Sequence, residues 1–210
     1  MSLPTAPNHM YLYREQTIRN FGYDDTTAVD YCFNSLGYRG REFVSAEPGI
    51  ILLGNTITFG LGVDYADTFG GIIEQRLNYP VYNFAWGCYA HTNNEQVLLL
   101  ERILTVLKPR YVIFQINNLN RFRDNGIVNF NNTTDVVIKE YNKFYSRIIP
   151  LLNTTPHGYL HWDENTYPVD LPKCLVYNKY HVDVSVASNP NTFGRKSHRL
   201  IAERILQENI

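Results

Sequence analysis

The chain has 210 residues, with 19 lysines and arginines against 20 aspartates and glutamates, so its formal charge is -1. A chain of this length forms one domain that buries roughly 70% of its unfolded surface without disulfides or metals. The near-neutral charge excludes the broad basic surface that nucleic-acid or anionic-membrane binding requires.

The apolar runs and the three cysteines indicate in which compartment the protein occurs. No run is long enough for a membrane span, and the first residues have no apolar core of signal-peptide length. We therefore expect a cytoplasmic protein, while a secreted form that has lost its leader stays open, as does the oligomeric state. Cys32, Cys88 and Cys174 are odd in number and widely spaced, which indicates reduced thiols, and we expect neither a structural metal nor a cofactor.

Apolar runs alternate with amphipathic stretches along most of the chain. The expected strands cover 49–53, 80–85 and 111–116. The expected helices have apolar residues at helical spacing and cover 66–78, 92–107, 133–150 and 197–208. Residues 153–192 are rich in proline and aromatic side chains, and only 173–177 and 181–187 look like strands there.

This alternation predicts a doubly wound parallel sheet with helices on both faces, because right-handed crossovers place them there. Residues 1–47 are expected to form a lead-in that packs on a domain of residues 48–210. Ligands in such folds bind at the carboxyl ends of strands. Those ends are rich in glycine, asparagine and other polar residues, and they cover 54–58, 86–91 and 117–121.

Several separated stretches resemble the SGNH, or GDSL-like, hydrolase family, in the family's order. They are NSLGYRGREF (34–43), GNTITFGLGVDYADTFGGIIEQRL (54–77), NFAWGCYAHTNNEQVLLLERIL (83–104), QINN (115–118) and NPNTFGRKSHRLIAERI (189–205). The resemblance implies a three-layer α/β/α, flavodoxin-like fold with a parallel sheet of about five strands. It also implies descent from ester hydrolases of the lipase/acylhydrolase type.

The catalytic triad of that family is not matched in this sequence. In the family a serine attacks an ester carbonyl, a histidine takes its proton, and an aspartate three residues earlier orients the histidine. Thr56 occupies the serine's position. Counting back from the last helix places Asn189 and Thr192 at the aspartate and histidine positions, whereas matching the family's His-Pro to Asn189 and Pro190 places Val186 and Asn189 there. Both alignments imply a degenerate triad.

The oxyanion hole of the family is better matched. The resemblance assigns its donors to the backbone N–H of Thr56, a backbone N–H at Cys88 or Gly87, and the side chain of Asn117. Asn55 and Asn118 stand where the family has aspartates. Because asparagine keeps hydrogen-bonding capacity without charge, the pocket would suit a small ester, polyol or acylated sugar.

Two functions follow from these residues, with a purely structural or assembly module as a third class. In the first, the protein binds such a ligand and is catalytically impaired, because loss of a triad member removes most of the turnover. In the second, it is an active ester hydrolase that uses Thr56 or Cys88 with His91 or His181. An imidazole nitrogen within about 3.5 Å of either nucleophile would favour the second. The remaining candidate, His198, is expected to be structural.

Overall fold

The largest sheet of the protein has five strands, all parallel, in the order β4-β3-β5-β8-β9. The computed structural model describes residues 4–6, 13–19, 29–44, 47–87, 92–117, 121–124, 127–130, 134–161, 174–183, 193–208 and 210. The strands of the large sheet are β3 (Ile50–Leu53), β4 (Val81–Asn83), β5 (Tyr111–Ile116), β8 (His157–His161) and β9 (Cys174–Val176). The predicted parallel sheet of about five strands is confirmed.

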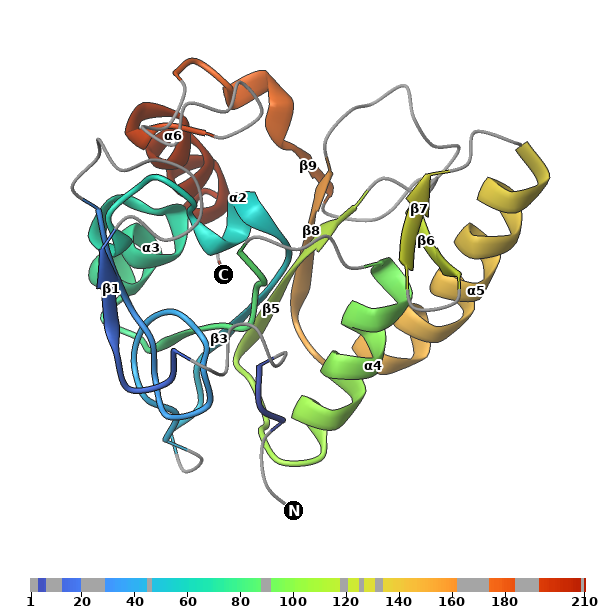
Figure 1. Ribbon diagram of the computed structural model, residues 1–210, viewed down its shortest axis with the longest axis horizontal. Helices are drawn as coiled ribbons and strands as arrows, with labels where there is room; N and C mark the ends of the chain where they lie inside the picture. The colour runs from blue at the N-terminus through green and yellow to red at the C-terminus, as the bar shows by residue number, and fades with distance from the viewer. Residues whose placement is uncertain are drawn as a thin grey trace.

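Helices cover both faces of this sheet and complete the three layers (Figure 1). One face carries α4 (Asn93–Leu104) and α5 (Thr134–Leu152), and the other carries α3 (Phe69–Leu77) and α6 (Arg195–Leu206). Ile51 and Leu53 of β3 belong to the core under α4 and α5, while Ile50 and Leu52 belong to the core under α3 and α6. A strand buried on both faces needs apolar residues at every position, which explains the continuous run that predicted it.

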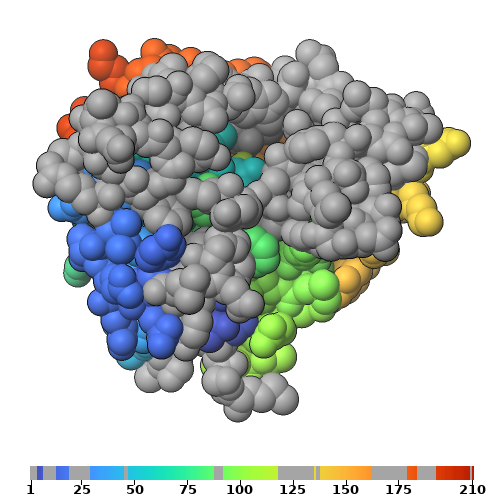
Figure 2. Space-filling view, viewed as in Figure 1, coloured from blue at the N-terminus to red at the C-terminus, as the bar shows by residue number. Residues whose placement is uncertain are grey.

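The residues before β3 pack against this sheet as a lead-in segment, which we define as residues 29–44. It contains β2 (Asp30–Cys32), which pairs antiparallel with β1 (Thr17–Arg19). Tyr31, Phe33 and Tyr38 are buried in the same core as α4 and β3. In the space-filling view the blue atoms of the N-terminal part of the chain lie at the surface, on the left of the view (Figure 2).

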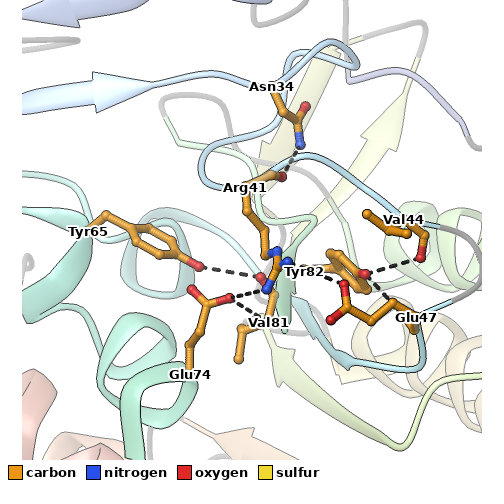
Figure 3. A network of polar contacts seen from close by, with 8 residues as sticks. All are labelled: Asn34, Arg41, Val44, Glu47, Tyr65, Glu74, Val81 and Tyr82. Atoms are coloured by element: carbon orange, nitrogen blue, oxygen red, sulfur yellow. Dashed lines mark hydrogen bonds and ion pairs between the residues drawn. The ribbon is translucent and has the colours of Figure 1, made fainter. Parts of the chain in front are cut away.

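A polar network fastens the lead-in segment to α3 and β4 (Figure 3). The Arg41 guanidinium lies 3.3 Å from a Glu47 carboxylate oxygen and 3.2 Å from one of Glu74. The Tyr82 hydroxyl donates to the backbone carbonyls of Val44 and Glu47, both at 3.2 Å. The segment is thus held on the sheet by polar contacts at its edge as well as by its buried aromatic rings.

The eight strands and helices predicted over 49–53, 80–85, 111–116, 173–177, 66–78, 92–107, 133–150 and 197–208 are all present, and most differ only at their ends. Strand β5 has the predicted bounds, and α4 begins after Thr92, which forms a capping box with Glu95. Helix α3 begins at Phe69 rather than at residue 66, because the Thr68 hydroxyl accepts from the N–H of Gly71 and residues 65–67 form a separate 3-10 turn, η1 (Tyr65–Asp67). Helix α5 continues two residues past Pro150, which lies in its last turn.

The interpretation of residues 153–192 is wrong in two places. Strand β8 was not predicted, because a histidine at each end and Gly158 interrupt its apolar pattern, yet β5 and β9 pair with it on both sides. Residues 181–183 do not form the predicted strand, because Asp183 turns to cap helix α6. The rest of that predicted strand lies outside the described residues. A short antiparallel pair, β6 (Arg121–Asp124) and β7 (Ile127–Phe130), was also missed.

Candidate functional site

The segments that follow β3, β4 and β5 meet at one edge of the sheet. Leu53 pairs with Phe114, so the residues after β3 and the end of β5 lie side by side. Strand β3 leads through Gly54 and Asn55 into the short helix α2 (Thr56–Phe59). Trp86, which follows β4, donates its backbone N–H to the backbone carbonyl of Gly54 at 3.2 Å. The carboxyl ends of three parallel strands therefore surround Thr56.

Thr56, which follows β3, and Asn117, which follows β5, both lie at this edge of the sheet. The half-buried Thr56 donates its hydroxyl to the carbonyl oxygen of Gly87 at 3.0 Å. Asn55, its neighbour, donates Nδ2 to Oδ1 of the buried Asn117 at 2.5 Å. Within the described part of the chain, the Gly87 carbonyl is the one hydrogen-bond partner of the Thr56 hydroxyl. A carbonyl is not a general base, so this contact does not activate the hydroxyl as a nucleophile.

Gln115 lies directly beneath the turn that carries Thr56. Its Oε1 accepts from the backbone N–H of Asn55 at 3.3 Å, the backbone N–H of Thr58 at 3.2 Å and the Thr58 hydroxyl at 2.6 Å. Its Nε2 donates to Oδ1 of Asn55 at 2.7 Å. Gln115 lies in the QINN block, and no role was predicted for it. A polar residue at the end of the otherwise apolar run YVIFQI was the signal that could have identified it.

Asn93, also missed, fixes the backbone of Asn117. It is buried at the first turn of α4, where its Nδ2 donates to the Asn117 carbonyl at 2.9 Å. Its Oδ1 accepts from the Asn117 N–H at 2.7 Å. The two hydrogen bonds satisfy the backbone N–H and C=O of Asn117 as a neighbouring strand would. They therefore fix the backbone from which the Asn117 side chain extends.

Arg39 supports the other end of the Thr56 turn. Its guanidinium, only 1% exposed, donates to the carbonyls of Phe59 at 2.9 Å, Gly60 at 2.6 Å and Val63 at 2.6 Å. It also lies over the Tyr31 ring, 4.3 Å from its centroid. Burial lowers the pKa of Arg39 to about 10, which leaves it cationic at neutral pH. Such a charge tolerates burial because carbonyl dipoles and an aromatic face replace water.

Gly54 provides the space in which these groups meet. A Cβ at this position would collide with the Thr58 side chain and would come within 2.7 Å of Gln115 Oε1. The close approach of the Gln115 carboxamide therefore requires a glycine here. On the far side of α2, Asn83 donates Nδ2 to the Thr58 carbonyl at 3.0 Å.

None of the histidines in the described part of the chain forms a hydrogen bond with the Thr56 hydroxyl. His198 is buried, and its Nδ1 accepts from the backbone N–H of Phe69 at 3.2 Å. Burial, with a smaller effect from the Arg39 charge and an opposing one from Asp183, lowers the pKa of His198 to about 3. It is a neutral link between α6 and α3, which confirms the expected structural role. The His181 ring stacks on Phe193, with 4.3 Å between ring centroids.

The other predicted site residues lie outside the part of the chain that the structure describes. They are Cys88, His91, Asn118, Val186, Asn189 and Thr192. Their assignments as oxyanion donor, base, or degenerate aspartate and histidine positions stay predictions. Among the described residues, no cluster of three or more His, Cys, Asp or Glu side chains could hold a metal ion, and no helix has the length and apolarity needed to cross a membrane.

Comparisons with known proteins agree on the fold. Neither a protein-family model nor a curated protein matches the sequence. Among solved structures, the chain is similar to a carbohydrate esterase family 2 enzyme with a carbohydrate-binding domain from Corynascus thermopiles (Myceliophthora fergusii), at 13% identity and a TM-score of 0.50 over 81% of this chain and 68% of that one. It is similar to a protein of the lipolytic G-D-S-L family from Desulfitobacterium hafniense, at 14% identity and a TM-score of 0.51 over 76% of this chain and 98% of that one.

A third similar structure is a carbohydrate esterase whose active site displays divergent catalytic and non-catalytic binding functions. The identity is 10% and the TM-score 0.52, over 81% of this chain and 66% of that one, so the present chain spans just under two thirds of its length. These likenesses confirm the SGNH, or GDSL-like, hydrolase fold that the sequence blocks predicted.

Proposed function

We propose that this protein binds a small, neutral, polar or acylated ligand at the Thr56–Gly87–Asn117 site and does not turn over esters at a useful rate. The observation that carries the proposal is the hydrogen bond from the Thr56 hydroxyl to the Gly87 carbonyl. A serine-type nucleophile needs a base to take its proton. Here the hydroxyl donates to a backbone carbonyl oxygen, which is too weak a base to remove the proton.

The electrostatics of the site support a neutral ligand. Within the described part of the chain, its polar side chains are those of Asn55, Thr56, Gln115 and Asn117, all of them uncharged. Carboxamides and hydroxyls offer donors and acceptors together, which suits the hydroxyl and acyl groups of a polyol or an acylated sugar. The similarity in fold to carbohydrate esterases is consistent with a ligand of this chemistry.

The expected loss of catalysis is large. Removal of the nucleophile or the base of a triad costs on the order of 10⁶ in turnover, and the oxyanion hole and binding leave about 10³ to 10⁴ over water. The competing function, an active esterase with a rewired site, needs an imidazole at the Thr56 hydroxyl. The described hydrogen bonds of Thr56 do not favour it.

The experiment combines an activity and a binding measurement. Hydrolysis of p-nitrophenyl acetate by the wild-type protein should equal that of Thr56→Ala. Thr105→Ala is a matched control, since the exposed Thr105 also donates to a backbone carbonyl, at 2.7 Å, but lies at the end of α4. Turnover that only Thr56→Ala abolishes would overturn the proposal.

Binding is measured by NMR titration with N-acetylglucosamine and with xylose. We expect shifts confined to residues around Thr56 and Asn117, and weaker binding in Thr56→Ala than in Thr105→Ala. Titrations without any shift at these residues would argue against a binding site and in favour of a structural or assembly role.

A further inference from the structure

We propose that Gln115 and Asn55 form an amide relay that fixes the polarity of the Asn117 carboxamide. The relay places Oδ1 of Asn117 toward Asn55 and its Nδ2, a donor, on the side away from Asn55. The site would then recognise its ligand through an acceptor oxygen, such as an acyl carbonyl. This last step rests on the proposed function, whereas the orientation of the amides does not.

The relay begins at backbone groups whose polarity is invariant. The N–H groups of Asn55 and Thr58 can only donate, and both point at the same Gln115 atom, at 3.3 and 3.2 Å. That atom must therefore be the carbonyl oxygen of the amide, because the NH₂ group has no acceptor to offer. The Thr58 hydroxyl adds a third donor at 2.6 Å.

The orientation of Gln115 determines the next two amides in turn. Its NH₂ group meets Asn55 at 2.7 Å, so the atom of Asn55 that it meets must be Oδ1. The Nδ2 of Asn55 is then directed at Asn117, at 2.5 Å, and requires an acceptor there. Asn93 holds both backbone groups of Asn117, which prevents a shift of the chain from relieving a mismatch.

Burial gives the relay its selectivity between orientations. Gln115 and Asn117 are 1% and 3% exposed, so a reversed amide would leave two donors or two acceptors facing each other away from water. Such a pair loses a hydrogen bond and keeps the desolvation cost of both groups. Gln115 sets the direction of the relay: a carboxylate there would accept from Asn55 Nδ2, which turns Asn55 Oδ1 toward Asn117 and requires Asn117 to donate toward Asn55 instead.

The first test uses the ligand-free protein and measures the relay directly. In protein labelled with ¹⁵N and ¹³C, scalar couplings across hydrogen bonds should join Asn55 Nδ2 to Asn117 Cγ and Gln115 Nε2 to Asn55 Cγ. The side-chain NH₂ protons of Asn55 and Gln115 should exchange slowly with water. A coupling in the reverse direction, or fast exchange of both NH₂ groups, would overturn the proposal.

The second test measures selectivity with two probes of the same shape. Acetate has only acceptors and acetamidinium has only donors. Wild-type protein should show saturable NMR shifts at Asn117 with sodium acetate and none with acetamidinium chloride. In Gln115→Glu, acetate affinity should fall at least tenfold and acetamidinium should bind.

Gln96→Glu separates amide polarity from charge. Gln96 is fully buried, and its Nε2 donates to the backbone carbonyl of Gln115 at 3.2 Å, so the variant adds the same charge nearby without entering the relay. It should retain the preference for acetate. The same reversal in Gln96→Glu as in Gln115→Glu would attribute the effect to charge and refute the selectivity.

The outcomes for the relay and for the proposed function remain distinguishable. If neither probe binds the wild-type protein, the binding function and the selectivity fail, while the couplings still decide the relay. If the carboxylate variants do not fold, which backbone amide spectra would reveal, the couplings and the two probes on the wild-type protein decide the proposal.

Discussion

The buried guanidinium of Arg39 donates to the carbonyl oxygen of Gly60 at 2.6 Å and so joins the lead-in segment to the end of helix α2. Gly60 caps this helix with φ of 81°, a left-handed conformation that glycine adopts without strain. Thr56 lies at the other end of the same helical turn. The geometry of the candidate site therefore depends on a residue that precedes the first strand of the sheet.

Arg39→Met should destabilise the protein by about 2 to 4 kcal/mol, because it leaves the carbonyls of Phe59, Gly60 and Val63 without their donor. Urea unfolding at neutral pH measures this loss. Arg147→Met is the control, since Arg147 pairs with the Glu101 carboxylate at 2.6 Å in a partly exposed setting and its loss should cost about 1 kcal/mol or less. Equal losses in the two variants would contradict the role given to Arg39.

His198→Asn should make the protein less sensitive to acid. The pKa of His198 is about 3 in the folded state and near 6.5 when unfolded, so the unfolded state takes up the proton first. The wild-type protein therefore has its full stability above pH 6.5 and loses up to about 1.4 kcal/mol per pH unit as the pH falls from there toward 3. Asparagine keeps an acceptor for the Phe69 N–H but has no proton to gain.

Urea unfolding of the wild type and His198→Asn at pH 7.5 and 5 tests this difference. Hydrogen bonds from Ser197 and from the backbone of Lys196 lower the pKa of Asp183 although its partial burial opposes them. That carboxylate stabilises the fold at higher pH and loses its effect as pH falls below about 4. The wild type and His198→Asn share this Asp183 effect, and it lies below the pH range of the measurement. An equal drop in stability between pH 7.5 and 5 would show that His198 is not responsible.

Gly54→Ala should destabilise the protein by about 2 kcal/mol, because the new methyl group would overlap the Thr58 side chain and crowd Gln115. Thermal or urea unfolding gives the magnitude. The same substitution should cost less in a Thr58→Ala background, where the nearest colliding atom, the Thr58 hydroxyl oxygen, is gone and Cβ at 2.5 Å is the one Thr58 side-chain atom left in conflict. Costs that simply add would mean that the two side chains do not compete for this space.

Combined substitutions should recover ester hydrolysis if the oxyanion donors are intact. One triple variant is Thr56→Ser with Asn189→Asp and Thr192→His, and the rival is Thr56→Ser with Val186→Asp and Asn189→His. Single changes should have almost no effect, because triad members act as a unit. Hydrolysis of p-nitrophenyl acetate by one triple identifies the correct alignment. If a triple folds, a structure shows its introduced histidine facing the hydroxyl at position 56, and it stays inactive, an intact oxyanion hole is excluded.

Much of the fold could be predicted from local patterns. Strand β5 was predicted at its observed bounds because all six of its residues are buried and, Gln115 apart, apolar, as a strand covered on both faces requires. The capping box of Thr92 and Glu95 marks the start of helix α4 through contacts between residues only three positions apart, which a sequence pattern can predict. The block around Gly54 and Thr56 located the edge of the sheet where the candidate site lies.

The sequence by itself thus determined the parallel sheet, its main helices and the turn that holds Thr56, because burial on a strand or helix and local capping leave a periodic trace in the chain. The tertiary structure alone decided the partners of the buried polar groups: Gln115 bonds to residues 57 and 60 positions away, and Arg39 to carbonyls 20 to 24 positions away. It likewise decided that residues 157–161 form a strand, since two neighbouring strands supply the hydrogen bonds that a weak apolar pattern does not predict. A hydrogen bond depends on where two groups are brought in space, and no periodicity along the chain records that position.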